Sequence, residues 1–315
     1  MASRAANLAL VDPIKPRNTL SPVHPEIWSL RPWKRRCVLP GINNWSDSSK
    51  GAFSDDGHLI AFGSRDSTIV IYDARKAKLW ARLGAPQQEP IVGEDFYSVG
   101  AVTFSPDRKT LASANRKGIF LWNLQSKRLI LSRPILERAN IRVEVNGRLV
   151  RPLGSAWLGA LQFSPDGQTL AMAGSSVVLF DLAAQRVRRT LRLDAGDGGA
   201  NVLIFSPDGR QLLSVGYWNA SAGAYDQIAL FDTRSGRALW RWDNQSKVPE
   251  EYDTSHFYTR AAFSSDGRRF AVANDNRLMI RRTRDARFVL ARQIERDGEA
   301  TLKRQKTVLP ELVMR

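Results

Sequence analysis

The chain has 315 residues, of which 43% are hydrophobic, 25% charged and 9% aromatic, a composition that excludes collagen-like, low-complexity and wholly disordered proteins. Lysine and arginine number 47 against 31 aspartates and glutamates, and the net charge of +16 favours an anionic partner. No apolar run approaches the roughly 18 residues of a membrane-spanning helix, so we expect no membrane span.

The excess positive charge is concentrated at the two ends of the chain. Residues 1–36 carry seven basic and two acidic side chains, and residues 277–315 carry eleven and five. The residues between them are nearly balanced, with 29 basic and 24 acidic side chains. This pattern indicates a nearly neutral body with basic arms that dock on an anionic partner, and solubility alone is the alternative explanation.

Residues 1–35 are interrupted by five prolines and contain too few apolar side chains for a core of their own, which predicts an extended basic arm. We expect the end of this arm to bind a partner through two tryptophans and four cations: Trp28, Trp33, Arg31, Lys34, Arg35 and Arg36. Single-stranded nucleic acid and an acidic protein groove fit this mixture equally well. The Ala-, Ser- and Arg-bearing first residues also leave import into an organelle open.

Cysteine and histidine are scarce. Cys37 is the only cysteine, and the three histidines lie far apart, so the sequence predicts neither an internal disulfide nor a zinc site. We expect no cofactor. The lone cysteine favours the cytoplasm or another reducing intracellular compartment.

Five segments share one template, an apolar strand that ends in Phe and is followed by Ser-Pro-Asp-Gly or a close variant. The phenylalanines lie 51, 59, 42 and 58 residues apart: Phe53, Phe104, Phe163, Phe205 and Phe263. In such a turn Pro presets φ, Asp bonds the backbone and Gly adopts a positive φ. A period near 40 residues with variable insertions is typical of propeller blades with loops of different length.

Each repeat continues with three further short apolar segments, so we expect a blade of four strands. Small residues follow the large residue of the second strand in most repeats, which lets neighbouring sheets crowd around an axis: Ala61, Ala112, Ala171 and Ala271. The third strand is expected at residues 69–73, 119–123, 177–181, 228–232 and 278–282. The fourth is expected at residues 79–83, 129–131, 187–193, 238–242 and 288–294.

Four of the third strands end in an aromatic residue followed by Asp or Asn: Tyr72-Asp73, Trp122-Asn123, Phe180-Asp181 and Phe231-Asp232. Together with the five turns, this pattern resembles the WD-repeat β-propeller family over about residues 36–294. The chain departs from the family because it lacks the Gly-His and Trp-Asp pairs, and Arg281-Arg282 replaces the aromatic–Asp pair in the fifth repeat. We therefore expect apolar packing between sheets to hold the blades.

The resemblance implies an all-β propeller with five clear four-stranded blades. Residues 36–39 precede the first repeat and residues 300–309 follow the last, so we expect the two ends to pair as a partial sixth blade. Residues 295–315 are then a basic tail that supplies one of its strands. A partner chain that completes the ring is the alternative.

Insertions at residues 84–98, 134–158 and 217–226 distinguish the blades, and the last two contain candidate binding residues. Residues 134–158 contain an alternating segment around Asn146-Gly147 that predicts a hairpin, and its candidate partner-binding residues are Arg142, Arg148 and Arg151. A simple extension of the blade is the alternative. Residues 217–226 interrupt the fourth repeat, and we expect a loop whose aromatics either anchor a partner or pack on the propeller: Tyr217, Trp218 and Tyr225.

The last repeat is rich in arginine. Alternation along a strand places Arg282 and Arg284 on one face and Arg281 on the other. We expect these three arginines to contact a phosphate-rich surface, and protection of an edge strand by charge is the alternative.

Signals for catalysis are poor, because the sequence contains no phosphate-binding glycine loop, no serine elbow and no paired nucleophile and base. Glu94, Asp95, Asp253 and His256 are candidates for a propeller-fold hydrolase, but nothing in the sequence joins them. We therefore expect a non-catalytic scaffold that mediates protein–protein assembly within a larger complex, with other protein subunits as partners and no small-molecule substrate. An RNA-binding subunit of a ribonucleoprotein is the alternative.

Overall fold

The computed structural model describes residues 2–3, 8–11, 26–30, 32–39, 51–64, 66–84, 99–115, 118–134, 143–145, 148–150, 159–174, 176–193, 199–220, 223–243, 260–274, 277–285 and 287–293. Within these ranges the regular structure consists of β-strands, and no helix is present.

Six antiparallel sheets of four strands each contain all of the strands except one hairpin. The first sheet consists of β1 (Ala2–Ser3), β2 (Leu8–Val11), β3 (Glu26–Leu30) and β4 (Trp33–Val38). The second consists of β5 (Ala52–Phe53), β6 (Leu59–Gly63), β7 (Ile69–Asp73) and β8 (Lys78–Leu83). The third consists of β9 (Ala101–Phe104), β10 (Thr110–Asn115), β11 (Gly118–Asn123) and β12 (Arg128–Pro134).

The fourth sheet consists of β15 (Ala160–Phe163), β16 (Thr169–Ala173), β17 (Val177–Asp181) and β18 (Arg186–Leu191). The fifth consists of β19 (Gly199–Phe205), β20 (Gln211–Ala220), β21 (Gly223–Asp232) and β22 (Ala238–Asp243). The last consists of β23 (Arg260–Phe263), β24 (Arg269–Asn274), β25 (Arg277–Arg282) and β26 (Phe288–Gln293). β13 (Val143–Val145) and β14 (Arg148–Val150) form the hairpin between the third and fourth sheets.

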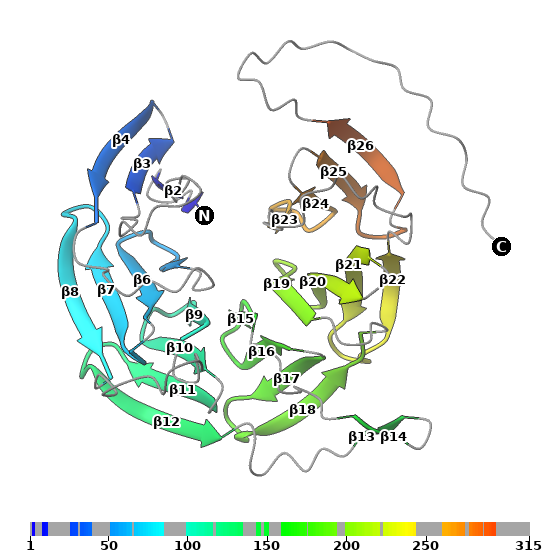
Figure 1. Ribbon diagram of the computed structural model, residues 1–315, viewed down its shortest axis with the longest axis horizontal. Helices are drawn as coiled ribbons and strands as arrows, with labels where there is room; N and C mark the ends of the chain where they lie inside the picture. Colours follow the sequence, from blue (N-terminus) through cyan, green and yellow to red (C-terminus); the bar gives the residue numbers. More distant parts are fainter. Residues whose placement is uncertain are drawn as a thin grey trace.

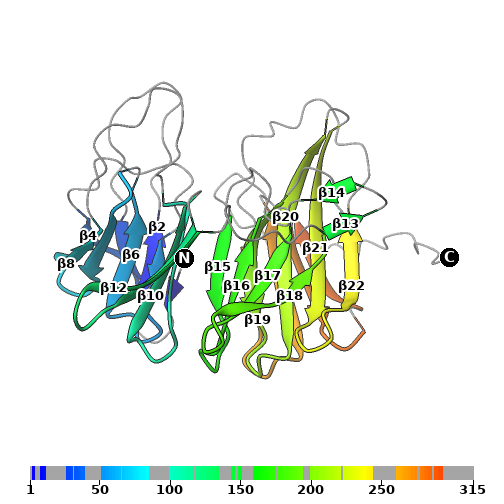
Figure 2. The same cartoon turned by 90° about the horizontal axis from the view of Figure 1, so that it is seen from below.

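The six sheets follow one another around an arc, and Figure 1 shows the first and the last sheet at its two ends. Strands β9, β15, β19 and β23 lie toward the centre of the arc, and β4, β8, β12, β18, β22 and β26 form its periphery. Figure 2 shows the same sheets edge-on. This is the all-β propeller architecture that the sequence predicted.

The shared Ser-Pro-Asp-Gly turn joins the first two strands of each of the five repeats. In the fourth sheet the Ser164 hydroxyl donates a hydrogen bond of 2.5 Å to the Asp166 carboxylate, which also accepts one of 3.0 Å from the Gln168 backbone N–H. Gly167 closes the turn at a φ of +70°, a conformation that a side chain disfavours. The same serine–aspartate hydrogen bond recurs in the other four turns, at Ser54, Ser105, Ser206 and Ser264.

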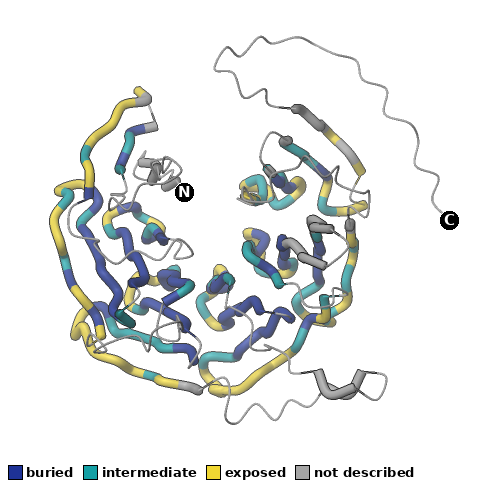
Figure 3. Tube along the Cα trace, viewed as in Figure 1, coloured by how far each residue is buried: buried dark blue, intermediate teal, exposed yellow. Residues whose placement is uncertain are grey.

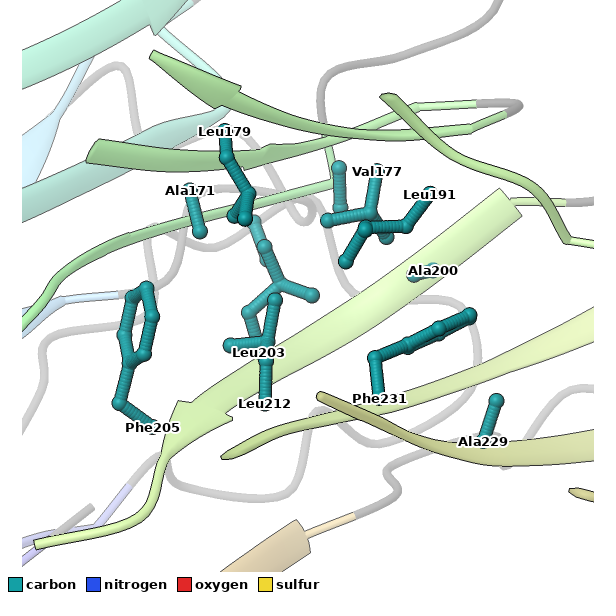
Figure 4. Packing of buried hydrophobic residues seen from close by; sticks show 12 residues of the cluster. Ala171, Val177, Leu179, Leu191, Ala200, Leu203, Phe205, Leu212, Ala229 and Phe231 are labelled. Atoms are coloured by element: carbon teal, nitrogen blue, oxygen red, sulfur yellow. The ribbon is translucent and has the colours of Figure 1, made fainter. Parts of the chain in front are cut away.

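Five apolar clusters join the six sheets in sequence. The largest lies between the fourth and fifth sheets, where Leu179 and Phe231 are both almost fully buried (Figure 4). The other four clusters join the first sheet to the second, the second to the third, the third to the fourth and the fifth to the last. Each buried Leu, Ile or Phe stabilises its interface by about 1.5–3 kcal/mol. Figure 3 shows that burial is highest on the middle strands of the sheets, such as β7, β16 and β17, and lowest on the periphery.

A register shift between the third and fourth strands recurs in every sheet and identifies equivalent positions. It falls between Ile71 and Tyr72 in the second sheet, and between Leu179 and Phe180 in the fourth. In the last sheet it falls between Ile280 and Arg281. The residue before the shift is therefore equivalent from sheet to sheet, and so is the residue after it.

The N-terminal segment differs from the sequence analysis, because the strands of the first sheet fall largely within residues 1–35. Its register shift lies between Ile27 and Trp28, as expected of a true repeat. The expected extended arm was inferred from the small number of apolar residues, but a propeller sheet needs no core of its own. Ile27 and Leu39 are instead completely buried against the second sheet. Residues 295–315 lie outside the described part of the chain.

The aromatic insertion at residues 217–226 also differs from expectation. The sequence analysis expected a loop, but β20 and β21 extend through this segment as a long hairpin that rises above the neighbouring strands in Figure 2. Tyr217 pairs with Asp226, and Trp218 pairs with Tyr225. Aromatic residues have a high propensity for β-strands, which agrees with an extended hairpin in this segment.

Candidate interaction surfaces

Among the described residues, the fifth sheet covers one face of the last sheet, and no sheet lies against the other face. Ala261, Phe263, Phe270, Val272 and Met279 pack against the fifth sheet. Because side chains alternate along a strand, the residues between them point to the other side. We call this side the open face, and it consists of Ala262, Ala271, Ala273, Leu278 and Ile280.

The open face is built from residue types that are buried in the preceding sheets. Ile280 precedes the register shift of its sheet and is partly exposed, whereas the equivalent Ile71, Leu179 and Leu230 are each 0% exposed. Ala271 pairs with Ile280 and is also partly exposed. Its equivalents in the second, third and fourth sheets are again 0% exposed: Ala61, Ala112 and Ala171. The open face therefore has the composition of a sheet interface but lacks a sheet against it in the described part of the chain.

A hollow lined mainly by arginines lies at one end of the last sheet. We call it the arginine hollow, and its volume is about 630 Å³. The lining residues are Arg268, Arg282, Thr283, Arg284, Asp285 and Arg287. Asp285 is the only carboxylate among them, and it lies 3.0 Å from Nη2 of Arg282 and 3.9 Å from Nε of Arg287. Four guanidinium groups and one carboxylate leave the hollow strongly positive.

The arginine hollow adjoins the open face. Leu278, Ile280 and Arg282 alternate along β25, so their side chains emerge on the same side of the sheet. The backbone fixes this end of the hollow, because the Arg282 N–H donates to the Arg287 carbonyl and the Thr283 N–H donates to the Arg268 carbonyl. The apolar side chains of Leu278 and Ile280 therefore lie in one row with Arg282, at the end of the sheet where the arginine hollow is.

The structure brings two of the three predicted C-terminal arginines together and separates the third. Arg282 and Arg284 both line the hollow, although Arg284 lies in the turn after β25 and not on the strand that the sequence analysis expected. Arg281 points to the covered side and is only 9% exposed, so its proposed contact with a partner surface is corrected. Its guanidinium packs on the Trp240 ring instead, and burial lowers its pKa below the ordinary value.

The predicted N-terminal residues lie on β3 and β4 at the other end of the arc. Lys34, Arg35 and Arg36 are exposed. Trp28 is half-buried, and its indole N–H donates a hydrogen bond of 2.8 Å to Glu26, which also pairs with Arg35. Trp28 is therefore held by its own sheet. Arg31 and the side chain of Trp33 lie outside the described residues.

For the remaining predicted residues the structure describes no side chain. Arg148 begins β14, while Arg142 and Arg151 fall outside the described ranges. The backbones of the three insertion aromatics lie on β20 and β21: Tyr217, Trp218 and Tyr225. Their binding role stays a prediction.

The outer strands form a basic periphery that the sequence analysis missed. Asp243 is the only acidic residue of these six strands, which contain many lysines and arginines: Lys34, Arg35, Arg36, Lys78, Arg82, Arg128, Arg133, Arg186, Arg188, Arg189, Arg241 and Arg292. A count of charges along the chain does not show that the basic residues gather on the outer strands, because each of the five repeats also has an aspartate in its turn. A separate count for the fourth strand of each repeat would have revealed it.

The described residues contain no group of three or more His, Cys, Asp or Glu side chains able to hold a metal ion. The same part of the chain contains no helix of a length and apolar character suited to crossing a membrane. The four residues considered for a hydrolase site lie outside the described ranges: Glu94, Asp95, Asp253 and His256.

The sequence is similar to a known repeat family and to several characterised proteins. Residues 47–73, around the first recognised turn and its following strands, match the model of the WD domain, G-beta repeat. The Small ribosomal subunit protein RACK1y of Oryza sativa subsp. japonica is 29% identical over 145 residues, 46% of this chain and 36% of that protein. The Pre-mRNA-processing factor 19 homolog 2 of Arabidopsis thaliana is 25% identical over 174 residues, 54% of this chain and 27% of that protein.

The alignments therefore span about a third of these curated relatives. Among solved structures, the Hydrazine Synthase of Kuenenia stuttgartiensis superposes with a TM-score of 0.54 and 17% sequence identity, over 78% of this chain and 66% of that one. At this identity the likeness supports the fold alone.

Proposed function

We propose that this chain, a divergent member of the WD-repeat β-propeller family, is a non-catalytic scaffold that assembles proteins into a larger complex. The open face is the observation that carries the proposal. The positions of Ile280 and Ala271 are each fully buried in three of the preceding sheets but are partly exposed here, and a protein surface is a partner that would cover them.

The architecture suits rigid presentation of such a surface. Each sheet is clamped to its neighbour by an apolar cluster, so the last sheet is held by the fifth and is positioned by the rest of the arc. A preorganised face loses little conformational freedom when a partner docks, which favours affinity. Binding by rigid sheets also needs no chemical step, in accord with the proposed absence of catalysis.

The relatives support assembly as the general role. The names of the RACK1 relatives refer to the small ribosomal subunit, and the name of the other relative refers to pre-mRNA processing. We propose by analogy that this chain also acts as a subunit, in the cytoplasm or another reducing compartment. An RNA partner is the competing proposal, and the basic periphery is the feature that favours it.

Copurification tests the scaffold directly. The tagged full-length chain is recovered from its native cells at high salt, with and without nuclease, and compared with the double variant Leu278→Gln/Ile280→Gln. We expect stoichiometric protein companions that survive nuclease and are lost from the double variant. Leu239→Gln, an exposed aliphatic position of β22, is the control and should retain them. Companions that persist in the double variant, or that disappear with nuclease, contradict the proposal.

A further inference from the structure

We propose that the arginine hollow receives the carboxylates of an acidic segment of the protein that covers the open face. This inference rests on the proposed scaffold function and specifies the chemistry of the partner. The partner's contact surface is an apolar row, which lies on Leu278 and Ile280, followed by glutamates or aspartates that reach Arg282 and the arginines beyond it.

Two of the arginines are available for such a segment. Within the described part of the chain, neither Arg268 nor Arg284 forms an ion pair, and both side chains are exposed. Arg282 and Arg287 both lie near the carboxylate of Asp285, so one negative charge is shared between these two arginines. Guanidinium groups bind carboxylates through two parallel hydrogen bonds, so incoming carboxylates gain both charge and geometric fit.

The lining residues favour an acidic protein over single-stranded nucleic acid. Nucleic-acid grooves of this type combine cations with exposed aromatic rings on which bases stack. The hollow has no aromatic residue among its lining residues, and the nearest such pairing, Arg281 on Trp240, lies on the covered face. The row that leads into the hollow is aliphatic, which suits protein side chains rather than a phosphate backbone.

A second copy of this chain does not suit the hollow. The chain carries a net charge of +16, so two copies repel one another overall. The outer strands of another copy would present mostly lysine and arginine to the four arginines of the hollow. The charge balance therefore selects a partner with an acidic surface.

Peptide binding to the full-length chain tests the inference. The probe is a fluorescein-labelled peptide in which alternating leucines are followed by a run of glutamates, and its glutamine counterpart and labelled oligouridylate are the comparisons. Fluorescence anisotropy is measured at about 50 and 300 mM NaCl, because ion pairing weakens with salt. We expect the glutamate peptide to bind more tightly than either comparison.

Matched variants locate the binding. Arg282→Gln/Arg284→Gln should weaken glutamate-peptide binding by about ten-fold or more, because charged hydrogen bonds are lost. Arg186→Gln/Arg188→Gln removes the same charge from exposed positions of β18 and should change binding by less than about two-fold. Thermal unfolding of both variants verifies that they fold. Equal weakening by the two variants, or tighter hollow-dependent binding of oligouridylate, overturns the inference.

The copurification experiment distinguishes failure of this inference from failure of the scaffold. If Leu278→Gln/Ile280→Gln loses the companions but Arg282→Gln/Arg284→Gln keeps them in full, the scaffold stands and the acidic segment is refuted. If Leu278→Gln/Ile280→Gln also retains the protein companions, the scaffold proposal itself fails.

Discussion

The guanidinium carbon of Arg281 lies 4.7 Å from the centroid of the Trp240 ring. Arg281 follows the register shift of the last sheet, the place that Tyr72, Phe180 and Phe231 occupy in earlier sheets. The last sheet thus replaces an aromatic side chain by an arginine that stacks on an aromatic ring of its neighbour. The substitution keeps the interface packed, since the arginine stem and plane cover apolar surface.

We predict that Arg281→Ala lowers the free energy of unfolding by roughly 1–2 kcal/mol, because both the stacking and the packing of the stem are lost. Arg281→Phe restores the residue type of the fifth sheet and should keep or raise stability. Urea unfolding followed by tryptophan fluorescence measures both variants. A loss of stability in Arg281→Phe as large as that in Arg281→Ala would show that the charge itself is essential.

Ile71 and Ile280 are the same residue type at equivalent positions, and in the described part of the chain a neighbouring sheet covers Ile71 but not Ile280. We predict that Ile71→Ala destabilises the isolated chain by about 2–5 kcal/mol because it leaves a cavity. Ile280→Ala should cost less than about 1 kcal/mol. Denaturant midpoints of the two variants provide the comparison, and equal losses would mean that the last sheet is covered within the chain.

The turn aspartates predict acid sensitivity. Burial raises the pKa of Asp56, but hydrogen bonds from Ser54, the His58 N–H and Arg108 outweigh it and lower this pKa to about 2. Hydrogen bonds also lower the pKa values of Asp107, Asp166, Asp208 and Asp266, with the serine of each turn as the first cause. Stability from these groups is therefore complete above their unfolded pKa of about 4 and is lost as the pH falls toward 2.

Urea midpoints should accordingly be nearly constant from about pH 7 to 5 and fall steeply between about pH 4 and 2. Asp56→Asn removes one of the titrating groups and should flatten part of this fall. An unchanged slope in that variant would refute the assigned role of Asp56.

Gly63 lies against the backbone of Val99, which directly precedes the third sheet. A Cβ at this position would lie 2.7 Å from the Cβ of Val99 and would also clash with the Val99 carbonyl. We predict that Gly63→Ala destabilises the chain by about 1–3 kcal/mol through overpacking. Thermal unfolding measures the loss, and a neutral result would show that the second and third sheets separate without cost.

Cys37 reports on the first sheet. Burial raises the pKa of its thiol, which the backbone at Ile27 and the charge of Arg36 only partly oppose. We predict that iodoacetamide modifies Cys37 several-fold more slowly in the folded chain than in urea, because the thiolate is the nucleophile. Equal rates would indicate that residues 1–35 form the extended arm that the sequence suggested.

Much of the fold could be predicted because its repeats carry a local signal. The Ser–Asp hydrogen bonds that define the turn need residues of fixed spacing, so five turns located five sheets. The first sheet has Trp28-Ser29 where a later repeat has Tyr72-Asp73, and it lacks the Phe-Ser-Pro-Asp-Gly turn. Its only sequence signal was the spacing from Ile27 to Lys34, which matches that from Ile71 to Lys78.

The interaction surfaces could be predicted from the sequence only in part. The sequence analysis expected Arg282 and Arg284 on one face of a strand, whereas Arg284 lies in the turn after β25 and reaches the hollow from there. Arg268 and Arg287 join them only through the strand connections of the last sheet. The open face was unpredictable for a different reason. Ala271, Leu278 and Ile280 resemble residues that most of the preceding sheets bury at the same positions. Only the arrangement of the sheets shows that no neighbouring sheet covers them in the described part of the chain.

Cysteine footprinting of position 280 tests the central claim most directly. In a Cys37→Ser background, Ile280→Cys is labelled with a maleimide in the isolated chain and in the complex purified from native cells. Leu179→Cys and Leu239→Cys serve as buried and exposed references. We predict rapid labelling of position 280 in the isolated chain and strong protection in the complex. Equally rapid labelling in both states, or protection already in the isolated chain, would contradict a scaffold that docks its partner on the open face.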